Sequence, residues 1–158
     1  MIQIYKNIKY KFFWGGKFSN FYPSEFTINN ITFNCGEQYF MYQKAITFND
    51  IESANKILLT ETPNKQKALG KKIKNFDSKI WDKCKYQLIK RGLIEKFNQN
   101  LDLKKYLLEH KDCIMVEASP YDRIWGIGFT DIEAIKNFDN WGENLLGKIL
   151  TELSNELI

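Results

Sequence analysis

Most apolar residues in this 158-residue chain recur at three-and-four spacing, the period of an α-helix with one buried face. Strand-length apolar runs lie between the helical segments, at Ile2–Tyr10 and Cys113–Glu117 among others. This mixture predicts the α+β class, as a single compact, helix-rich domain over residues 1–158 with a small β-sheet. The predicted helices cover Cys35–Thr47, Asp50–Leu59, Pro63–Lys72, Asp77–Phe97, Leu101–Glu109 and Glu143–Leu157.

Turn and cap residues mark several boundaries between these elements. Asn29 and Asn30 separate two short apolar runs, and because Asn tolerates positive φ, they predict a two-residue hairpin turn. Asn34 is expected to cap the Cys35 helix, and Thr62 with Pro63 is expected to open the third helix.

The composition is that of an ordinary globular protein, with 44% hydrophobic and 27% charged residues. No stretch approaches the roughly 20 apolar residues of a membrane span, and the N-terminus lacks an export signal. We therefore expect a soluble, cytoplasmic monomer without a membrane partner. The net charge of +4 is spread over the chain, so its densest group of lysines, within Lys65–Lys74, is interpreted as a solvated surface. Binding of nucleic acid there is the weaker alternative.

Cysteine and histidine are too few for several kinds of site. The three cysteines are far apart and His110 is the only histidine, which excludes a disulfide framework and a four-ligand zinc site. His110 is expected to cap the end of a helix. The sequence predicts no metal and no bound cofactor, so carboxylates and a lysine have to carry any chemistry.

Two segments place such residues beside aromatic or glycine neighbours. Glu37 and Lys44 are seven residues apart, which puts both on one face of the Cys35 helix. In the second segment, Glu117 ends a strand, and Asp122 and Arg123 lie in the loop that follows. In that loop Trp125 precedes two glycines, of which Gly126 is the first. The structural alternative for the first segment is a Glu37 that complements the helix dipole and a Lys44 that extends to the surface. For the second segment it is an internal pair of Arg123 with Glu117 or Asp122.

A third segment runs from Asn140 to Lys148, where Trp141-Gly142 leads into the last helix. The N–H groups at a helix N-terminus attract phosphate, and Asn144 adds a side-chain amide. An ordinary helix start explains the same pattern.

Taken together, these segments resemble the NADAR family. The resemblance covers nearly the whole chain and rests on Phe18-Ser-Asn-Phe21, Gly36-Glu-Gln-Tyr-Phe40, Gln43-Lys-Ala45, Gly70, Trp81, Val116-Glu-Ala-Ser-Pro-Tyr-Asp-Arg-Ile-Trp-Gly126 and Asn144-Leu-Leu-Gly147. It implies a YbiA-like fold and hydrolysis of the N-glycosidic bond of a ribosyl phosphate or ADP-ribosyl substrate. The substrate would be ADP-ribosylated guanine in DNA or a ribosylaminopyrimidine phosphate from riboflavin biosynthesis. One departure favours the ADP-ribosyl branch, because the YbiA branch has Asp where this chain has Ile127.

The resemblance implies roles for individual residues. Glu37, Lys44 and Asp122 are the expected catalytic residues. Substrate binding is expected from Asn20, Trp81, Glu117, Arg123, Trp125, Gly126 and Asn144. Lys44 either holds phosphate or acts as a nucleophile through a Schiff base. We expect Glu37 and Asp122 to line the same cleft. The alternative function is a non-catalytic module that binds ADP-ribose or a nucleotide.

Overall fold

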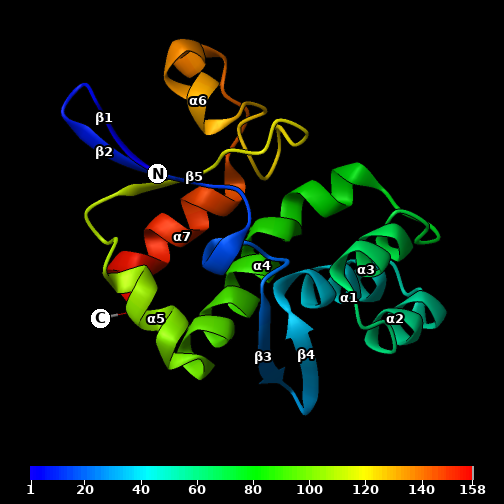
Figure 1. Cartoon of the computed structure of the whole chain (residues 1–158). Helices are drawn as coiled ribbons and strands as arrows, with labels where there is room; N and C mark the ends of the chain where they lie inside the picture. Colours follow the sequence, from blue (N-terminus) through cyan, green and yellow to red (C-terminus); the bar gives the residue numbers. More distant parts are fainter. Residues whose placement is uncertain (158) are drawn as a thin grey trace. The chain divides into compact units, whose positions relative to one another are not determined.

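The chain opens with a β-hairpin whose strands are β1 (Ile2–Tyr5) and β2 (Ile8–Phe13). The expectation of a single strand in this region is therefore wrong. Lys6 and Asn7 adopt left-handed backbone conformations, with φ of 48° and 64°, and reverse the chain between the strands. β2 also pairs in parallel with β5 (Ile114–Glu117), giving a three-stranded sheet in the order β1-β2-β5 (Figure 1).

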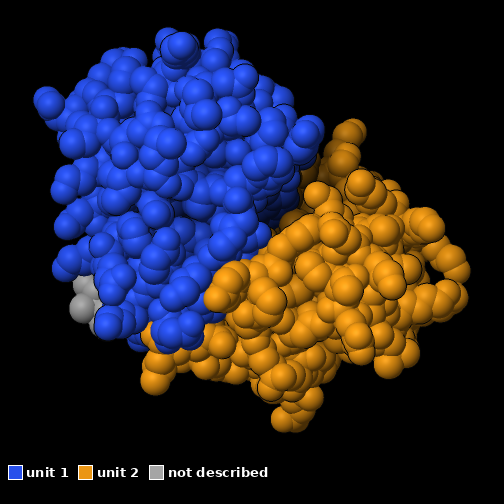
Figure 2. Space-filling model, in the orientation of Figure 1, with its two compact units in different colours: residues 1–19, 102–158 blue, residues 20–101 orange. Residues whose placement is uncertain are grey.

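The computed structural model describes residues 1–157, which divide into two compact units (Figure 2). Unit 1 consists of Met1–Ser19 and the chain from Asp102 onward. Unit 2 is the intervening segment, Asn20–Leu101. Each unit contains one of the two sheets, so each has its own arrangement of strands and helices.

In unit 1, one face of the three-stranded sheet carries an apolar core. The short helix α6 (Asp131–Ala134) and the 3-10 helix η2 (Ile135–Asn140) contribute to this core, and α7 (Leu145–Glu156) packs against β5. A second 3-10 helix, η1 (Gly16–Phe18), lies near α5 (Leu101–Leu108), with 4.8 Å between the rings of Phe18 and Tyr106. The buried core residues are Tyr10, Phe12, Val116, Ala118, Ile127 and Ala134.

Unit 2 is built around helix α1 (Gly36–Thr47). Helix α1 follows the predicted hairpin, which consists of β3 (Pro23–Ile28) and β4 (Ile31–Cys35). The turn residues of this hairpin, Asn29 and Asn30, have φ of 50° and 65°. α1 packs against α2 (Ile51–Leu58), α3 (Pro63–Gly70) and α4 (Ser78–Gln99). Asn34 lies in β4, and the N-cap of α1 is Cys35, so the predicted cap is wrong by one residue.

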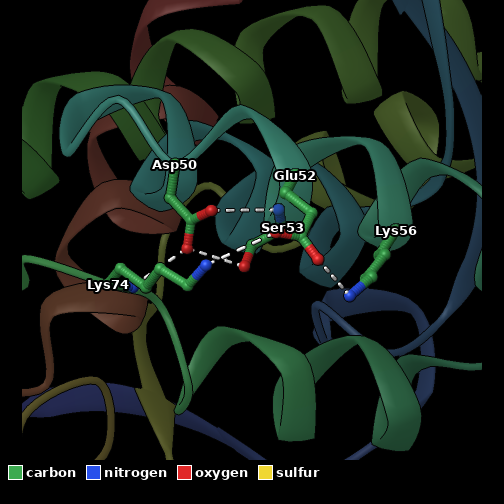
Figure 3. A network of polar contacts seen from close by, with 5 residues as sticks. All are labelled: Asp50, Glu52, Ser53, Lys56 and Lys74. Atoms are coloured by element: carbon green, nitrogen blue, oxygen red, sulfur yellow. Dashed lines mark hydrogen bonds and ion pairs between the residues drawn. The ribbon is translucent and has the colours of Figure 1, made fainter.

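A network of polar contacts fixes the start of α2 (Figure 3). The carboxylate of Asp50 accepts hydrogen bonds from the backbone N–H of Ser53 at 3.1 Å, the hydroxyl of Ser53 at 2.7 Å and the backbone N–H of Lys74 at 2.9 Å. Glu52 forms ion pairs with Lys56 at 2.7 Å and with Lys74 at 3.4 Å. One buried carboxylate thus caps a helix and also ties the chain after α3 to it.

The long helix α4 buries charged side chains and exposes an apolar one. Ile80 is 52% exposed, whereas Lys85 and Lys96 are buried. Lys85 pairs with Asp82 at 2.7 Å. No helix within residues 1–157 combines the length and the apolar character that a membrane crossing requires.

Candidate active site

The first group of predicted site residues lies at the N-terminus of α1, in unit 2. Cys35 occupies the N-cap position, but its side chain does not cap the helix. The backbone carbonyl of Asn20 accepts a hydrogen bond from the N–H of Glu37 at 2.8 Å instead. The Glu37 side chain is only 5% exposed, and the positive end of the helix dipole stabilises its carboxylate.

Asn20 brings a second buried polar group to this helix end. Its side chain is 9% exposed, and its Oδ1 atom has no hydrogen-bond partner within residues 1–157. Buried polar atoms are nearly always hydrogen-bonded, so this oxygen is suited to a donor from a ligand or a water molecule.

Lys44 lies two turns further along α1 and is half-buried. Its Nζ atom donates a hydrogen bond to the carbonyl of Gly70 at 3.0 Å and lies 4.4 Å from the centre of the Phe76 ring. Burial lowers the pKa of Lys44 below its ordinary value, and the negative charge of Glu37 opposes this shift. The two predicted catalytic residues of unit 2 are therefore electrostatically coupled, as their spacing indicates.

Trp81 belongs to the same group through its packing on α1. It is buried, and its ring stacks on that of Phe40 with 5.8 Å between the ring centres and 18° between the planes. The indole is largely enclosed by side chains of unit 2, including Phe48.

Phe76, whose ring lies near Lys44, was not among the predicted site residues, and no sequence pattern singles it out.

The second group lies in unit 1, in the loop after β5. Asp122 Oδ1 accepts hydrogen bonds from the backbone N–H groups of Ile124 at 2.8 Å and of Trp125 at 2.9 Å, which makes a tight turn. Within residues 1–157, Asp122 Oδ2 makes no hydrogen bond. One carboxylate oxygen therefore holds the loop, and the other remains available to a ligand or water.

Gly126 allows this loop to fold back onto the end of β5. A Cβ atom at this position would lie 2.8 Å from the carbonyl oxygen of Glu117 and 3.0 Å from that of Asp122. The half-buried Glu117 and Trp125 are held in the same turn, where the N–H of Ile127 donates to the carbonyl of Glu117 at 3.0 Å.

Arg123 braces the same loop from its exposed side. Its Nη2 atom donates to the carbonyl of Asn140 at 2.6 Å, and its guanidinium carbon lies 5.6 Å from the centre of the Phe129 ring. In the part of the chain that the structure describes, its partners are thus a carbonyl and a ring, and the expected alternative of an Arg–carboxylate pair does not occur.

Asn144 is a buried residue in the left-handed region, with φ of 52°. Its side-chain oxygen accepts from the N–H of Glu117 at 3.0 Å, and its side-chain nitrogen donates to the carbonyl of Met115 at 3.0 Å. The backbone N–H groups of residues 144–146 donate to carbonyls of residues 124–126. The expectation that these N–H groups are open to phosphate is therefore wrong, while substrate contact by the Asn144 side chain stays a prediction.

The structure thus gathers the ten predicted residues into two groups, one in each unit. The unit 2 group is Asn20, Glu37, Lys44 and Trp81, and the unit 1 group is Glu117, Asp122, Arg123, Trp125, Gly126 and Asn144. That the two groups serve one reaction stays a prediction. Among residues 1–157, no group of three or more His, Cys, Asp or Glu side chains is arranged to hold a metal ion.

Comparison with known proteins decides the family. Residues 12–158 match the family model described as the NADAR domain. The chain belongs to the NADAR family. The predicted family is confirmed, and the motifs from Phe18 to Gly147 all fall within this NADAR domain.

The NADAR domain has close relatives in a virus, an animal and a bacterium. An N-glycosidase of Acanthamoeba polyphaga mimivirus is 40% identical, over 94% of this chain and 96% of the relative. Protein irg-1 of Caenorhabditis elegans is 37% identical, over 89% of this chain and 74% of the relative. The NMR structure of E. coli YbiA matches with a TM-score of 0.77 and 27% identity, over 94% of this chain and 84% of that one. This likeness confirms the predicted α+β, YbiA-like fold.

The resemblance stated above predicts an Asp in the YbiA branch at the position of Ile127, and the structure gives the setting of Ile127 in this chain. Ile127 is fully buried in the core of unit 1 with Tyr10, Phe12 and Val116. An ionised Asp here would lie among apolar side chains, which carries a large desolvation cost. In this chain the position therefore belongs to the core.

Proposed function

We propose that this protein is a hydrolase that cleaves the N-glycosidic bond of a ribosyl phosphate or ADP-ribosyl substrate. The observation that carries this proposal is the buried Glu37 carboxylate at a helix N-terminus, on the same helix as the half-buried Lys44. Such a reaction needs negative charge near the sugar carbon where positive charge develops. The N-glycosidase name of the mimivirus relative supports the same class.

The two carboxylates suit different steps of the cleavage. Glu37 is buried, and a charge in a low-dielectric setting stabilises an oxocarbenium-like transition state more strongly than one in water. Asp122 is half-exposed and keeps Oδ2 available, so it can take the proton from the attacking water. The water oxygen bonds to C1′, the C–N bond breaks, and the nucleobase leaves with its bonding electrons and is then protonated.

Lys44 has two candidate roles that its setting supports. As an ammonium group it holds the phosphate of the substrate, together with Arg123. The lowered pKa also raises the fraction of neutral amine, which is the form that attacks the opened sugar C1′ to form a Schiff base. Borohydride treatment during turnover separates the roles, because reduction adds the mass of the sugar to Lys44 only if the Schiff base forms. The Lys44→Arg variant keeps the charge and loses the nucleophile.

We propose an ADP-ribosylated guanine in DNA as the leading substrate and a ribosylaminopyrimidine phosphate as the second candidate. The buried Ile127 supports this order, since the YbiA-type acidic group is missing. We further propose that the protein acts as a cytoplasmic monomer.

The test of the proposed reaction is product release from both substrates, followed by mass spectrometry. The wild-type protein should release free ADP-ribose and leave unmodified guanine in the DNA, or release the free aminopyrimidine and ribose phosphate. Glu37→Gln removes the charge and should lower kcat by about 10²- to 10⁴-fold, while substrate binding changes only a few-fold. Glu52→Gln, an exposed carboxylate of the same unit, is the matched control and should keep wild-type turnover.

Two results would contradict this proposal. Wild-type turnover by Glu37→Gln would remove Glu37 from the mechanism. Tight binding of both substrates without release of either product would instead favour the non-catalytic ADP-ribose or nucleotide-binding module.

A further inference from the structure

Two aromatic side chains of unit 1 are strongly exposed and touch each other. Trp14 is 60% exposed and Tyr121 is 86% exposed, and their ring centres are 5.7 Å apart with 58° between the planes. Among the residues that the structure describes, Phe76, at 44%, is the only other exposed aromatic residue. It packs against Phe48 and Lys44.

The Trp14–Tyr121 pair is unusual because large aromatic rings gain most of their stabilising free energy from burial. A single exposed ring is common, whereas two exposed rings in contact form a patch of the kind that binds a partner. Tyr121 also precedes Asp122 in the loop that holds the unit 1 group, and its N–H donates to Ser119 Oγ at 3.3 Å. The pair therefore adjoins predicted site residues in the same loop.

A hollow of about 610 Å³ lies on the surface of unit 1, with Trp14 as part of its lining. Gly15 and Gly16 line it as well, with φ of 89° and 68°, in a conformation that other residues rarely adopt. A Cβ atom at either glycine would meet nothing within 4 Å, so the space above this backbone is open. The exposed Ile132 lines the hollow too and adds an apolar side chain to its wall.

We infer that Trp14, supported by Tyr121, is a stacking platform for a nucleobase of a single-stranded nucleic-acid substrate, one that neighbours the ADP-ribosylated nucleotide. Aromatic rings accept the face of any base, which gives binding without sequence preference. The inference rests on the proposed function and narrows its substrate class to a polynucleotide.

The exposure of the pair points to a neighbouring base and not to the reacting nucleoside. A bond that is hydrolysed through a charged transition state needs a site that excludes bulk water, and two rings at 60% and 86% exposure do not provide one. An open platform suits a base that the strand itself keeps near the site. Lys11 and Lys17 add positive charge to the same unit, with their Nζ atoms 5.8 and 5.1 Å from the centre of the Tyr106 ring.

The first experiment measures binding without catalysis. A fluorescein-labelled, unmodified single-stranded oligodeoxynucleotide is titrated with protein at fixed salt, and Kd is read from anisotropy. Trp14→Ala should weaken binding about 5- to 100-fold, Tyr121→Ala less, and Trp14→Phe only slightly. Leu59→Ala, an 84% exposed residue of unit 2, is the control and should leave Kd unchanged. An unchanged Kd for Trp14→Ala in a folded variant would overturn the platform, as would equally tight binding of free AMP.

The second experiment measures kcat/KM for an ADP-ribosylated single-stranded oligonucleotide and for ADP-ribosyl-guanosine. Wild-type protein should prefer the oligonucleotide, and Trp14→Ala should lower the oligonucleotide-to-nucleoside ratio about 5- to 100-fold. A ratio that Trp14→Ala does not change would overturn the inference. Hydrolysis of neither compound by the wild type would instead contradict the proposed ADP-ribosyl substrate, and the binding experiment would still test the platform.

Discussion

Lys96, in the last turns of α4, is a fully buried lysine. Its Nζ atom lies 5.5 Å from the centre of the Phe97 ring. Burial lowers the pKa of Lys96 to about 8, although the nearby Cys35 thiol acts in the opposite direction. Protonation of this residue is therefore less favourable in the folded protein than in the unfolded chain.

The free energy of unfolding should rise with pH between about 8 and 10. In this window the unfolded chain holds the Lys96 proton while the folded protein has released it, and stability increases where the unfolded state binds more protons. The full change in the free energy of unfolding that Lys96 causes is of the order of 3 kcal/mol, because its pKa is about 2.5 lower in the folded protein than in the unfolded chain. Urea unfolding of the wild type and of Lys96→Met across this range would measure it, with Lys83→Met, an exposed lysine of the same helix, as control. Equal pH slopes for wild type and Lys96→Met would contradict the prediction.

At the residue scale, the sequence predicted polar groups with motif context and missed those without it. Glu37 and Lys44 stand out because their spacing places them on one helix face, where the negative charge of Glu37 opposes the lowering of the Lys44 pKa by burial. Lys96 looks like any other lysine in a chain rich in lysine, since its burial depends on the packing of α4 in unit 2. The exposure of Trp14 was not predictable either, because no local sequence pattern distinguishes an exposed tryptophan from a tryptophan in the core.

At the scale of elements, the start of α2 depends on Asp50. Its hydrogen bonds, above all that from the backbone N–H of Lys74, lower the pKa of Asp50 to about 2. The carboxylate therefore stabilises the fold fully above its unfolded pKa of about 4, and this stabilisation is lost as the pH falls from about 4 to 2.

Asp50→Asn should lower the midpoint of thermal unfolding by a few degrees at pH 7, because the amide is a weaker acceptor for the three donors. The variant should also lose less stability than the wild type between pH 4 and 2. Calorimetry at several pH values checks both effects, with Asp102→Asn, an exposed residue early in α5, as the control. An identical fall in midpoint with pH for Asp50→Asn and the wild type would refute the role of this carboxylate.

The elements that the sequence predicted are those with strong local signals. The hairpin at Asn29 and Asn30 was predictable because two asparagines in a row favour the left-handed turn that the structure shows. The turn at Lys6 and Asn7 was missed because lysine carries no such signal and the apolar alternation continues across it. α6 and η2 were missed because they are too short for a helical period to appear.

At the scale of the whole molecule, the sheet of unit 1 depends on contacts between distant parts of the sequence. Tyr10 in β2 pairs with Ile114 in β5, and all of unit 2 lies between them in the chain. Such long-range pairing cannot be deduced from local patterns, so the order of the strands was not predicted. The grouping of the unit 1 site residues could be predicted, because nearly all of them belong to one short loop.

We propose that residues 1–158 nevertheless behave as one domain in unfolding. Differential scanning calorimetry should then show one transition with an enthalpy of about 100 kcal/mol and a calorimetric enthalpy equal to the van't Hoff value. Two resolved transitions, each with a part of this enthalpy, would show that the single-domain prediction is wrong.

The contacts of Asn144 have a consequence for association between copies of the protein. β5 is at the end of its sheet, and such a strand normally offers its backbone groups to any other strand. Here the side chains of Asn144 and Thr151 already occupy the N–H groups of Glu117 and Met115 and the carbonyl of Met115. A strand from a second molecule would have to displace α7 to pair there, so this edge is protected from the growth of intermolecular sheets and from amyloid-like aggregation.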